Sequence, residues 1–217
     1  MNYRDIQDLI DEGEGFAIEL KRKVSRPQKI AKTMIAFANT KGGTILFGVD
    51  DDHTIVGVES EKEEMEMIQT AGSYYCDPPI EPAIDIVPFK KKDVIAVTIA
   101  ESDRKPHVLF VDGDDELKDG TNVYIRVDDK TVEASKEVVK ILESENPDAP
   151  PLRIALGDNE RRLFEYLDAH QRITVKEYAR EINVSPRRAS RSLIQLVRAG
   201  VMRIHTNEKE EYYTRAF

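Results

Sequence analysis

Apolar positions along the first two thirds of the chain repeat with two different periods. Around Ile18 and Leu20 they alternate with polar residues, which is the period of a half-buried strand. After Pro27 they recur at helical spacing, and the glycine pair at 42–43 ends that helix before an apolar strand over 44–49. The same patterns predict helices over 4–11, 61–71 and 135–143, and strands over 16–21, 54–58, 83–87, 94–99, 108–111 and 123–127. These elements predict an α+β domain with a mixed or mainly antiparallel sheet.

A proline-rich stretch over residues 146–152 marks a boundary in the chain. Its three prolines withhold backbone donors and keep the segment extended, as in a short stiff linker. The charge also changes there, because the net charge of −9 divides into −13 for residues 1–151 and +4 for residues 152–217. We therefore expect one domain over 1–145 and a second, basic domain over 153–217 that is attracted to a nucleic-acid backbone.

The pattern after the linker predicts three helices and a hairpin. Asp158 is the expected N-cap of a helix through Ala169, and a second helix covers 175–182. A third helix opens at Ser185-Pro186, with a capping side chain followed by proline in the first turn, and ends at Gly200. Two short strands follow, over 202–205 and 212–214. This order is typical of a winged helix-turn-helix domain.

The third of these helices carries the candidate DNA contacts. Arginine forks near the start of such a helix suit both base edges in the major groove and phosphate oxygens. The candidate residues are Arg187, Arg188, Arg191, Arg198, Ser190 and Gln195. The alternative is a solvated basic face on a winged helix that binds only other proteins. The acidic hairpin tip at Glu208, Glu210 and Glu211 favours that alternative, because a wing often touches phosphates.

Composition excludes several other classes of protein. The chain is 40% hydrophobic and 34% charged, which is not a disordered composition. No apolar run has the length of a membrane span, and the first residues lack a signal peptide, so we expect a cytoplasmic protein with no membrane partner. Cys76 is the single cysteine, which excludes an internal disulfide and a cysteine-based zinc site.

Four short motifs in the acidic part carry a family resemblance. They are Glu14-Gly-Phe-Ala-Ile-Glu-Leu-Lys21, Ala36-Phe-Ala-Asn-Thr-Lys-Gly-Gly43, Ile45-Leu-Phe-Gly-Val-Asp-Asp-Asp52 and Ile55-Val-Gly-Val58, with Lys105-Pro106 and Val123-Tyr-Ile-Arg126 further on. In these motifs the chain resembles the Schlafen-type AlbA-like domain family over about residues 8–145. Many bacterial members join this domain to a C-terminal winged helix and are described as transcriptional regulators. The resemblance implies a DNA-binding regulator that needs no cofactor, with duplex DNA as partner and the AlbA-like domain serving dimerisation or ligand sensing.

The resemblance also implies an alternative, a metal-dependent nuclease. Some animal Schlafen proteins are ribonucleases whose site uses two glutamates and an aspartate, which match Glu14, Glu19 and Asp51 here, with Lys21 beside a scissile phosphate. Mg²⁺ or Mn²⁺ takes such hard carboxylate ligands, and RNA or single-stranded nucleic acid would be the substrate. The animal enzymes have a duplicated domain with a basic groove, whereas this domain is single and acidic. A homodimer would restore the duplication.

The family also carries an older label as an ATP-binding domain. Thr40-Lys-Gly-Gly-Thr44 contains glycines and a lysine, but it lacks the order of a phosphate-binding loop and does not join a strand to a following helix. Termination of the preceding helix is the stronger interpretation of Gly42 and Gly43. Three classes therefore remain: a DNA-binding regulator, a nuclease, and a protein-interaction module.

Overall fold

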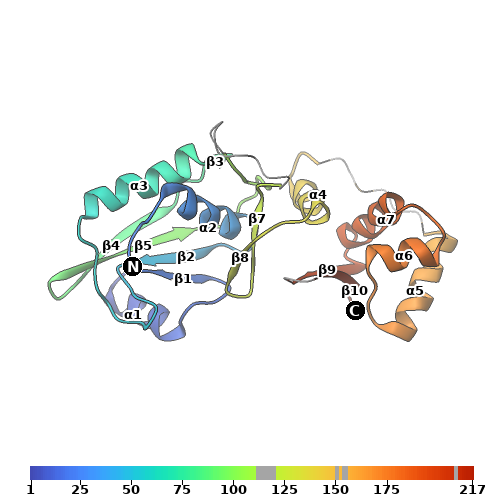
Figure 1. The fold of residues 1–217 in the computed structure, drawn as a ribbon, viewed down its shortest axis with the longest axis horizontal. Helices are drawn as coiled ribbons and strands as arrows, with labels where there is room; N and C mark the ends of the chain where they lie inside the picture. Colours follow the sequence, from blue (N-terminus) through green and yellow to red (C-terminus); the bar gives the residue numbers. More distant parts are fainter. Residues whose placement is uncertain (111–120, 150–151, 153–155, 208–209) are drawn as a thin grey trace. The chain divides into compact units, whose positions relative to one another are not determined.

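The chain folds as two units, Met1–Ser135 and Lys136–Phe217 (Figure 1). The computed structural model describes residues 1–110, 121–149, 152, 156–207 and 210–217. Parts of the expected elements lie outside these residues, namely Val111, Pro150, Pro151, residues 153–155 and Glu208. Among the described residues, no helix is both long enough and apolar enough to cross a membrane.

A four-stranded mixed sheet forms the centre of the N-terminal unit. The elements in chain order are α1 (Tyr3–Glu12), β1 (Ile18–Lys21), α2 (Pro27–Asn39), β2 (Gly43–Phe47), α3 (Glu61–Tyr74), β3 (Cys76–Asp77), β4 (Ala83–Phe89), β5 (Lys92–Ile99), β6 (Val108–Leu109), β7 (Tyr124–Val127) and β8 (Lys130–Glu133). The main sheet has the strand order β1-β2-β5-β4, with β1 parallel to β2 and the other pairs antiparallel. Strands β3 and β6 form a separate antiparallel pair, as do β7 and β8. The expected α+β class with a mixed sheet is confirmed.

Side chains that alternate along β2 divide the core into two layers. Ile45 and Phe47 join the cluster that α2 and α3 bury against one face of the sheet. Leu46 points to the other face, where it packs in a cluster with Ile6 and Ile10 of α1. Figure 1 shows α1 and α3 on opposite sides of the sheet. The sheet is therefore buried on both faces, which explains why Ile45, Leu46 and Phe47 follow one another in β2 without a polar residue between them.

Helix α2 and the turn after it hold the most distinctive motif of the sequence. Pro27 occupies the first turn, as predicted, and the helix ends at Asn39. Gly42 has a φ of 75°, and a Cβ atom there would lie 2.6 Å from the carbonyl oxygen of Ile99. A Cβ atom at Gly43 would lie 2.5 Å from the Phe37 ring. Both glycines are thus required by the backbone conformation and by close packing.

The structure differs from the predicted elements between residues 16 and 58. Phe16 is 42% exposed and precedes β1, so the strand begins at Ile18. The expected strand over 54–58 is reduced to an isolated bridge between Val49 and Ile55. The backbone N–H groups of this segment donate to Gly48 and to Asp93 at separate points, so no continuous ladder forms.

In the residues that the structure describes, the C-terminal unit contains four helices and one hairpin. The elements are α4 (Lys136–Glu145), α5 (Asp158–His170), α6 (Val175–Glu181), α7 (Pro186–Arg198), β9 (Met202–Thr206) and β10 (Glu211–Arg215). Its core includes Leu163 from α5, Tyr178 from α6, Leu193 from α7 and Tyr213 from β10. The N-cap of α5 is Gly157 instead of the predicted Asp158, which is the first helical residue.

Helix α4 belongs with the C-terminal unit, although the sequence placed it at the end of the first domain. It packs against α7, and its apolar residues Val138 and Leu142 are buried. Glu137 accepts a hydrogen bond from the Ser190 hydroxyl at 2.8 Å. The unit boundary therefore falls at residue 135 instead of 145.

Candidate functional site

The start of α7 is built by its capping residues. Ser185 has extended backbone angles, and its hydroxyl oxygen accepts a hydrogen bond from the Arg188 amide at 3.4 Å. Pro186 follows in the first turn, where its missing N–H costs nothing. The apolar stripe of the helix, which includes Leu193 and Leu196, enters the core of the unit. This packing fixes which side chains of α7 face outward.

The candidate DNA contacts separate into exposed and covered groups. Arg187, Arg188, Arg191 and Gln195 are exposed, and Arg198 is half-buried. Ser190 is only 3% exposed and donates its hydroxyl to Glu137 of α4. The expectation that Ser190 presents a free hydroxyl to DNA is therefore corrected, because α4 covers that flank of α7.

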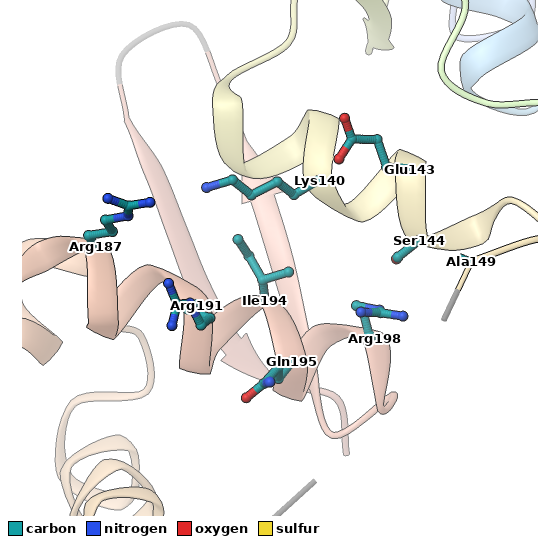
Figure 2. A pocket seen from close by; sticks show the side chains of 9 residues that line it. All are labelled: Lys140, Glu143, Ser144, Ala149, Arg187, Arg191, Ile194, Gln195 and Arg198. Carbon is teal, nitrogen blue, oxygen red and sulfur yellow. The ribbon is translucent and has the colours of Figure 1, made fainter. Parts of the chain in front are cut away.

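A cavity between α4 and α7 borders these arginines. Its volume is about 370 Å³. The lining residues labelled in Figure 2 come from both helices, with Lys140 and Glu143 on α4 and Arg187, Arg191, Gln195 and Arg198 on α7. Ser144, Ala149 and Ile194 complete the lining. Three of the four arginines that the sequence assigned to one helix, all but Arg188, thus line a cavity whose other wall is α4.

The carboxylates of the nuclease hypothesis make local contacts in the N-terminal unit. Glu14 accepts a hydrogen bond from the Leu20 amide at 3.0 Å. Glu19 is bonded through Oε1 to the Lys21 ammonium group at 2.5 Å. The amide of Asp51 donates to Asp50, at the start of the turn after β2. Within the described ranges, no group of three or more His, Cys, Asp or Glu side chains is placed to hold a metal ion.

Glu19 has a second cationic partner, Arg126 of β7, at 2.8 Å from Oε2. The Arg126 guanidinium also donates to the Gly15 carbonyl at 2.6 Å and to the Thr131 hydroxyl at 3.1 Å, and it lies over the Phe37 ring. Two cations therefore occupy both oxygens of Glu19. Since Glu14, Glu19 and Asp51 are not brought together as one metal-binding group, the nuclease alternative is not favoured.

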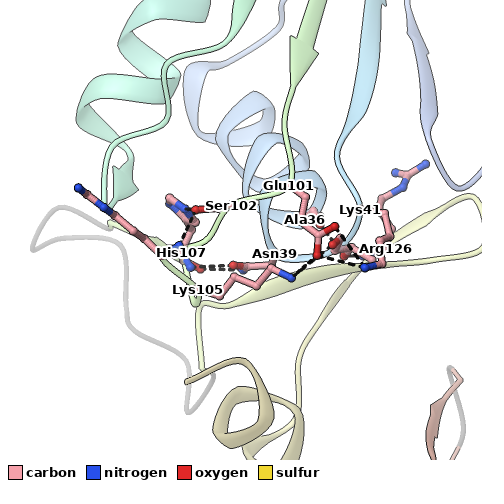
Figure 3. Close-up of polar contacts among 10 residues, drawn as sticks. Ala36, Asn39, Lys41, Glu101, Ser102, Lys105, His107 and Arg126 are labelled. Carbon is pink, nitrogen blue, oxygen red and sulfur yellow. Dashed lines mark hydrogen bonds and ion pairs between the residues drawn. The ribbon is translucent and has the colours of Figure 1, made fainter. Parts of the chain in front are cut away.

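Asn39 joins α2 to two distant segments (Figure 3). Its amide nitrogen donates to the carbonyls of His107 and Tyr124, at 2.9 and 3.1 Å, and its amide oxygen accepts from the His107 N–H at 2.7 Å. Next to it, the Thr40 hydroxyl donates to Ala36 and accepts from the Arg126 amide. These contacts are structural, and they explain why an Asn-Thr pair stands at the end of α2.

His107 and Lys105 complete the same network. The His107 ring contacts the Pro78 carbonyl and the Ser102 hydroxyl, both at 2.7 Å, and burial lowers its pKa. Lys105 is 6% exposed and pairs with Glu101 at 2.7 Å, and this hydrogen bond lowers the pKa of Glu101. The sequence assigned no role to His107, because a lone histidine gives no spacing signal.

One family model and two solved structures resemble parts of this chain. The family model described as "Schlafen, AlbA_2" matches residues 14–135. The N-terminal domain of a RecG-related protein from Nitrosomonas europaea, solved by solution NMR, is 24% identical over 60% of this chain and 95% of that one, with a TM-score of 0.43. The crystal structure of the DIP2311 protein from Corynebacterium diphtheriae is 17% identical over 77% of this chain, with a TM-score of 0.47, and the match spans only 37% of that protein. No curated protein sequence matches this chain.

The N-terminal unit is thus an α+β domain that carries the motif set of one family. The chain belongs to the Schlafen, AlbA_2 family. This membership suggests a role related to nucleic acids. The matched range ends at residue 135, where the structure also divides the chain.

Proposed function

We propose that this protein is a DNA-binding transcriptional regulator whose C-terminal unit is a winged helix. The observation that carries the proposal is the exposed row of Arg187, Arg188 and Arg191 on α7, a helix whose opposite side is packed in the core. A core-packed helix presents its outward side chains in a fixed orientation, and an arginine fork pairs with guanine edges and phosphate oxygens. The hairpin β9–β10 after α7 agrees with a wing.

The electrostatics of α7 support the same function. Within the described part of the chain, the side chains of Arg187, Arg188 and Arg191 have no acidic partner. Their charge is therefore available to a polyanion. The N-terminal unit is acidic, and a nucleic-acid backbone repels it, so DNA contact is expected through the C-terminal unit.

The N-terminal unit then has the role of a dimerisation or ligand-sensing domain. A homodimer would offer two copies of α7 to the paired half-sites that such proteins commonly bind. Sedimentation equilibrium of the full chain, with and without duplex DNA, tests this part. A monomer under both conditions at high protein concentration would exclude the dimer while leaving DNA binding by one copy intact.

Fluorescence anisotropy with labelled duplex DNA over a range of salt concentrations tests DNA binding. The double variant Arg188→Ala, Arg191→Ala should weaken binding by at least about tenfold. The slope of the logarithm of the binding constant against the logarithm of the salt concentration should become less steep by about 0.9 for each phosphate contact that is lost. Because no operator is identified, a library of random duplexes enriched by the protein itself supplies the probe.

The matched control is the double variant Arg161→Ala, Arg162→Ala, which removes the same charge from exposed positions of α5 in the same unit. It should bind nearly as well as the wild-type chain. An equal loss of DNA affinity in both double variants would mean that binding depends only on the net charge of the unit. Binding that is absent, or insensitive to salt, would favour the protein-interaction class instead.

A further inference from the structure

The cavity between α4 and α7 has the size and lining of a small-ligand site. Its volume of about 370 Å³ lies within the range of small-molecule pockets. Figure 2 shows that the residues lining it come from both helices. Helix α4 is held in place by burial of Val138 and Leu142 and by the hydrogen bond between Glu137 and Ser190. The cavity is therefore formed by two packed helices instead of a loose surface loop.

The lining of this cavity is strongly cationic. Lys140, Arg187, Arg191 and Arg198 contribute four positive charges, against one negative charge from Glu143. In the part of the chain that the structure describes, neither Lys140 nor Arg191 forms an ion pair. The single Glu143 carboxylate balances only one of these charges, so like charges such as Lys140 and Arg191 repel each other, and a bound anion relieves this repulsion. The cavity thus favours a multiply charged anion.

The types of side chain indicate which anion. Arginine forks pair with two oxygens of a phosphate at once, and lysine adds a compact charge. The Gln195 amide adds a neutral hydrogen-bond donor, while Ile194 and Ala149 provide an apolar surface for the remainder of a ligand. We propose that the cavity between α4 and α7 binds a phosphate-bearing small molecule, with Lys140 and Arg191 as its principal contacts.

This site has a regulatory consequence that rests on the proposed DNA binding. Arg187 and Arg191 line the cavity and are also proposed DNA contacts. One guanidinium group cannot fully satisfy a ligand phosphate and a DNA phosphate at the same time. Occupancy of the cavity therefore competes with duplex binding, and the small molecule acts as a negative effector.

Isothermal titration calorimetry with inorganic pyrophosphate and the full chain, without DNA, tests the site itself. We expect saturable binding to the wild-type protein and at least a tenfold weaker affinity in the Lys140→Ala variant. The matched control is Lys136→Ala, which removes the same charge from an exposed position of α4 outside the cavity and should bind as the wild type does. Circular dichroism melting establishes that both variants are folded.

A second measurement tests the competition. Pyrophosphate should displace labelled duplex from the wild-type chain more strongly than potassium chloride at the same ionic strength, and this excess should disappear in Lys140→Ala. Absent pyrophosphate binding, or equal binding by Lys140→Ala and the wild type, overturns the site. Binding that depends on Lys140 without excess displacement overturns the competition. Pyrophosphate binding with no duplex binding at all supports the site and instead refutes the proposed DNA-binding function.

Discussion

Arg126 and Glu19 form a buried ion pair between β7 and β1, with Nη1 2.8 Å from Oε2. The Arg126 side chain is 1% exposed and that of Glu19 is 15% exposed. The pair joins segments that are far apart in the sequence and ties the edge of the main sheet to the β7–β8 pair. Glu19 therefore has a structural role, because it is the counter-charge of Arg126.

Replacement of Glu19 by alanine should destabilise the protein. It leaves the Arg126 guanidinium buried without its counter-charge, which costs roughly 2–4 kcal/mol of unfolding free energy. Urea denaturation followed by circular dichroism measures this loss, with Glu12→Ala at an exposed position of α1 as the control. Unchanged stability, combined with loss of a manganese-dependent cleavage activity, would instead restore a catalytic role for Glu19.

Replacement of Asn39 by alanine removes three hydrogen bonds at once. We expect a loss of about 3 kcal/mol of unfolding free energy, because the buried groups of His107 and Tyr124 lose their partners. Hydrogen exchange of the His107 amide should accelerate by more than that of amides in the C-terminal unit. Asn159→Ala, on α5, is the control, and an equal effect in that variant would contradict the structural role of Asn39.

Burial of His107 predicts a specific pH dependence. Its pKa is lowered by desolvation, which outweighs the hydrogen bond to the Pro78 carbonyl. The unfolded chain therefore binds a proton more readily, so the stability from neutral His107 is present above about pH 6.5 and is lost as the pH falls below it. Urea denaturation at pH 7.5 and 5.5 measures the free energy of unfolding. Its decrease between the two pH values should be larger for the wild type than for His107→Gln. In the control variant His53→Gln, at an exposed position, the free energy of unfolding should decrease as much as it does in the wild type.

Cys76 should react with thiol reagents only after unfolding. Burial raises the pKa of its thiol from 9.0 to about 12, and its Sγ lies 3.3 Å from the Ala71 carbonyl oxygen. The thiolate fraction at pH 8 is thus about a thousandfold lower than for an exposed cysteine. Labelling with a chromogenic disulfide reagent gives an unambiguous signal, because the chain has one cysteine. Rapid labelling of the folded protein would contradict this environment.

Local signals predicted the elements with the clearest patterns. Pro27 and Ser185-Pro186 defined the starts of α2 and α7 correctly, because a proline in the first turn and the Ser185 cap depend on neighbouring residues alone. The alternation of Ile18 and Leu20 identified the buried face of β1 for the same reason. The prediction failed for residues 54–58, where pairing depends on how distant strands approach each other.

Contacts between distant segments could not be read from the sequence. Arg126 stood in a motif of the family, but nothing local indicated that its charge would be buried beside Glu19. Ser190 was expected to offer its hydroxyl to DNA, and the packing of α4 shows that it is covered and bonded to Glu137. In both cases the partner lies more than fifty positions away, beyond the reach of periodicity.

The packing of α4 on α7 has a practical consequence for any fragment of this protein. A fragment that starts at residue 153, after the proline-rich stretch, loses α4 and uncovers Ile194 together with the Ser190 hydroxyl. Such a fragment exposes the Ile194 side chain beside its basic residues, and we expect it to self-associate or to bind nucleic acid less selectively. A fragment that starts at residue 136 keeps Ile194 covered.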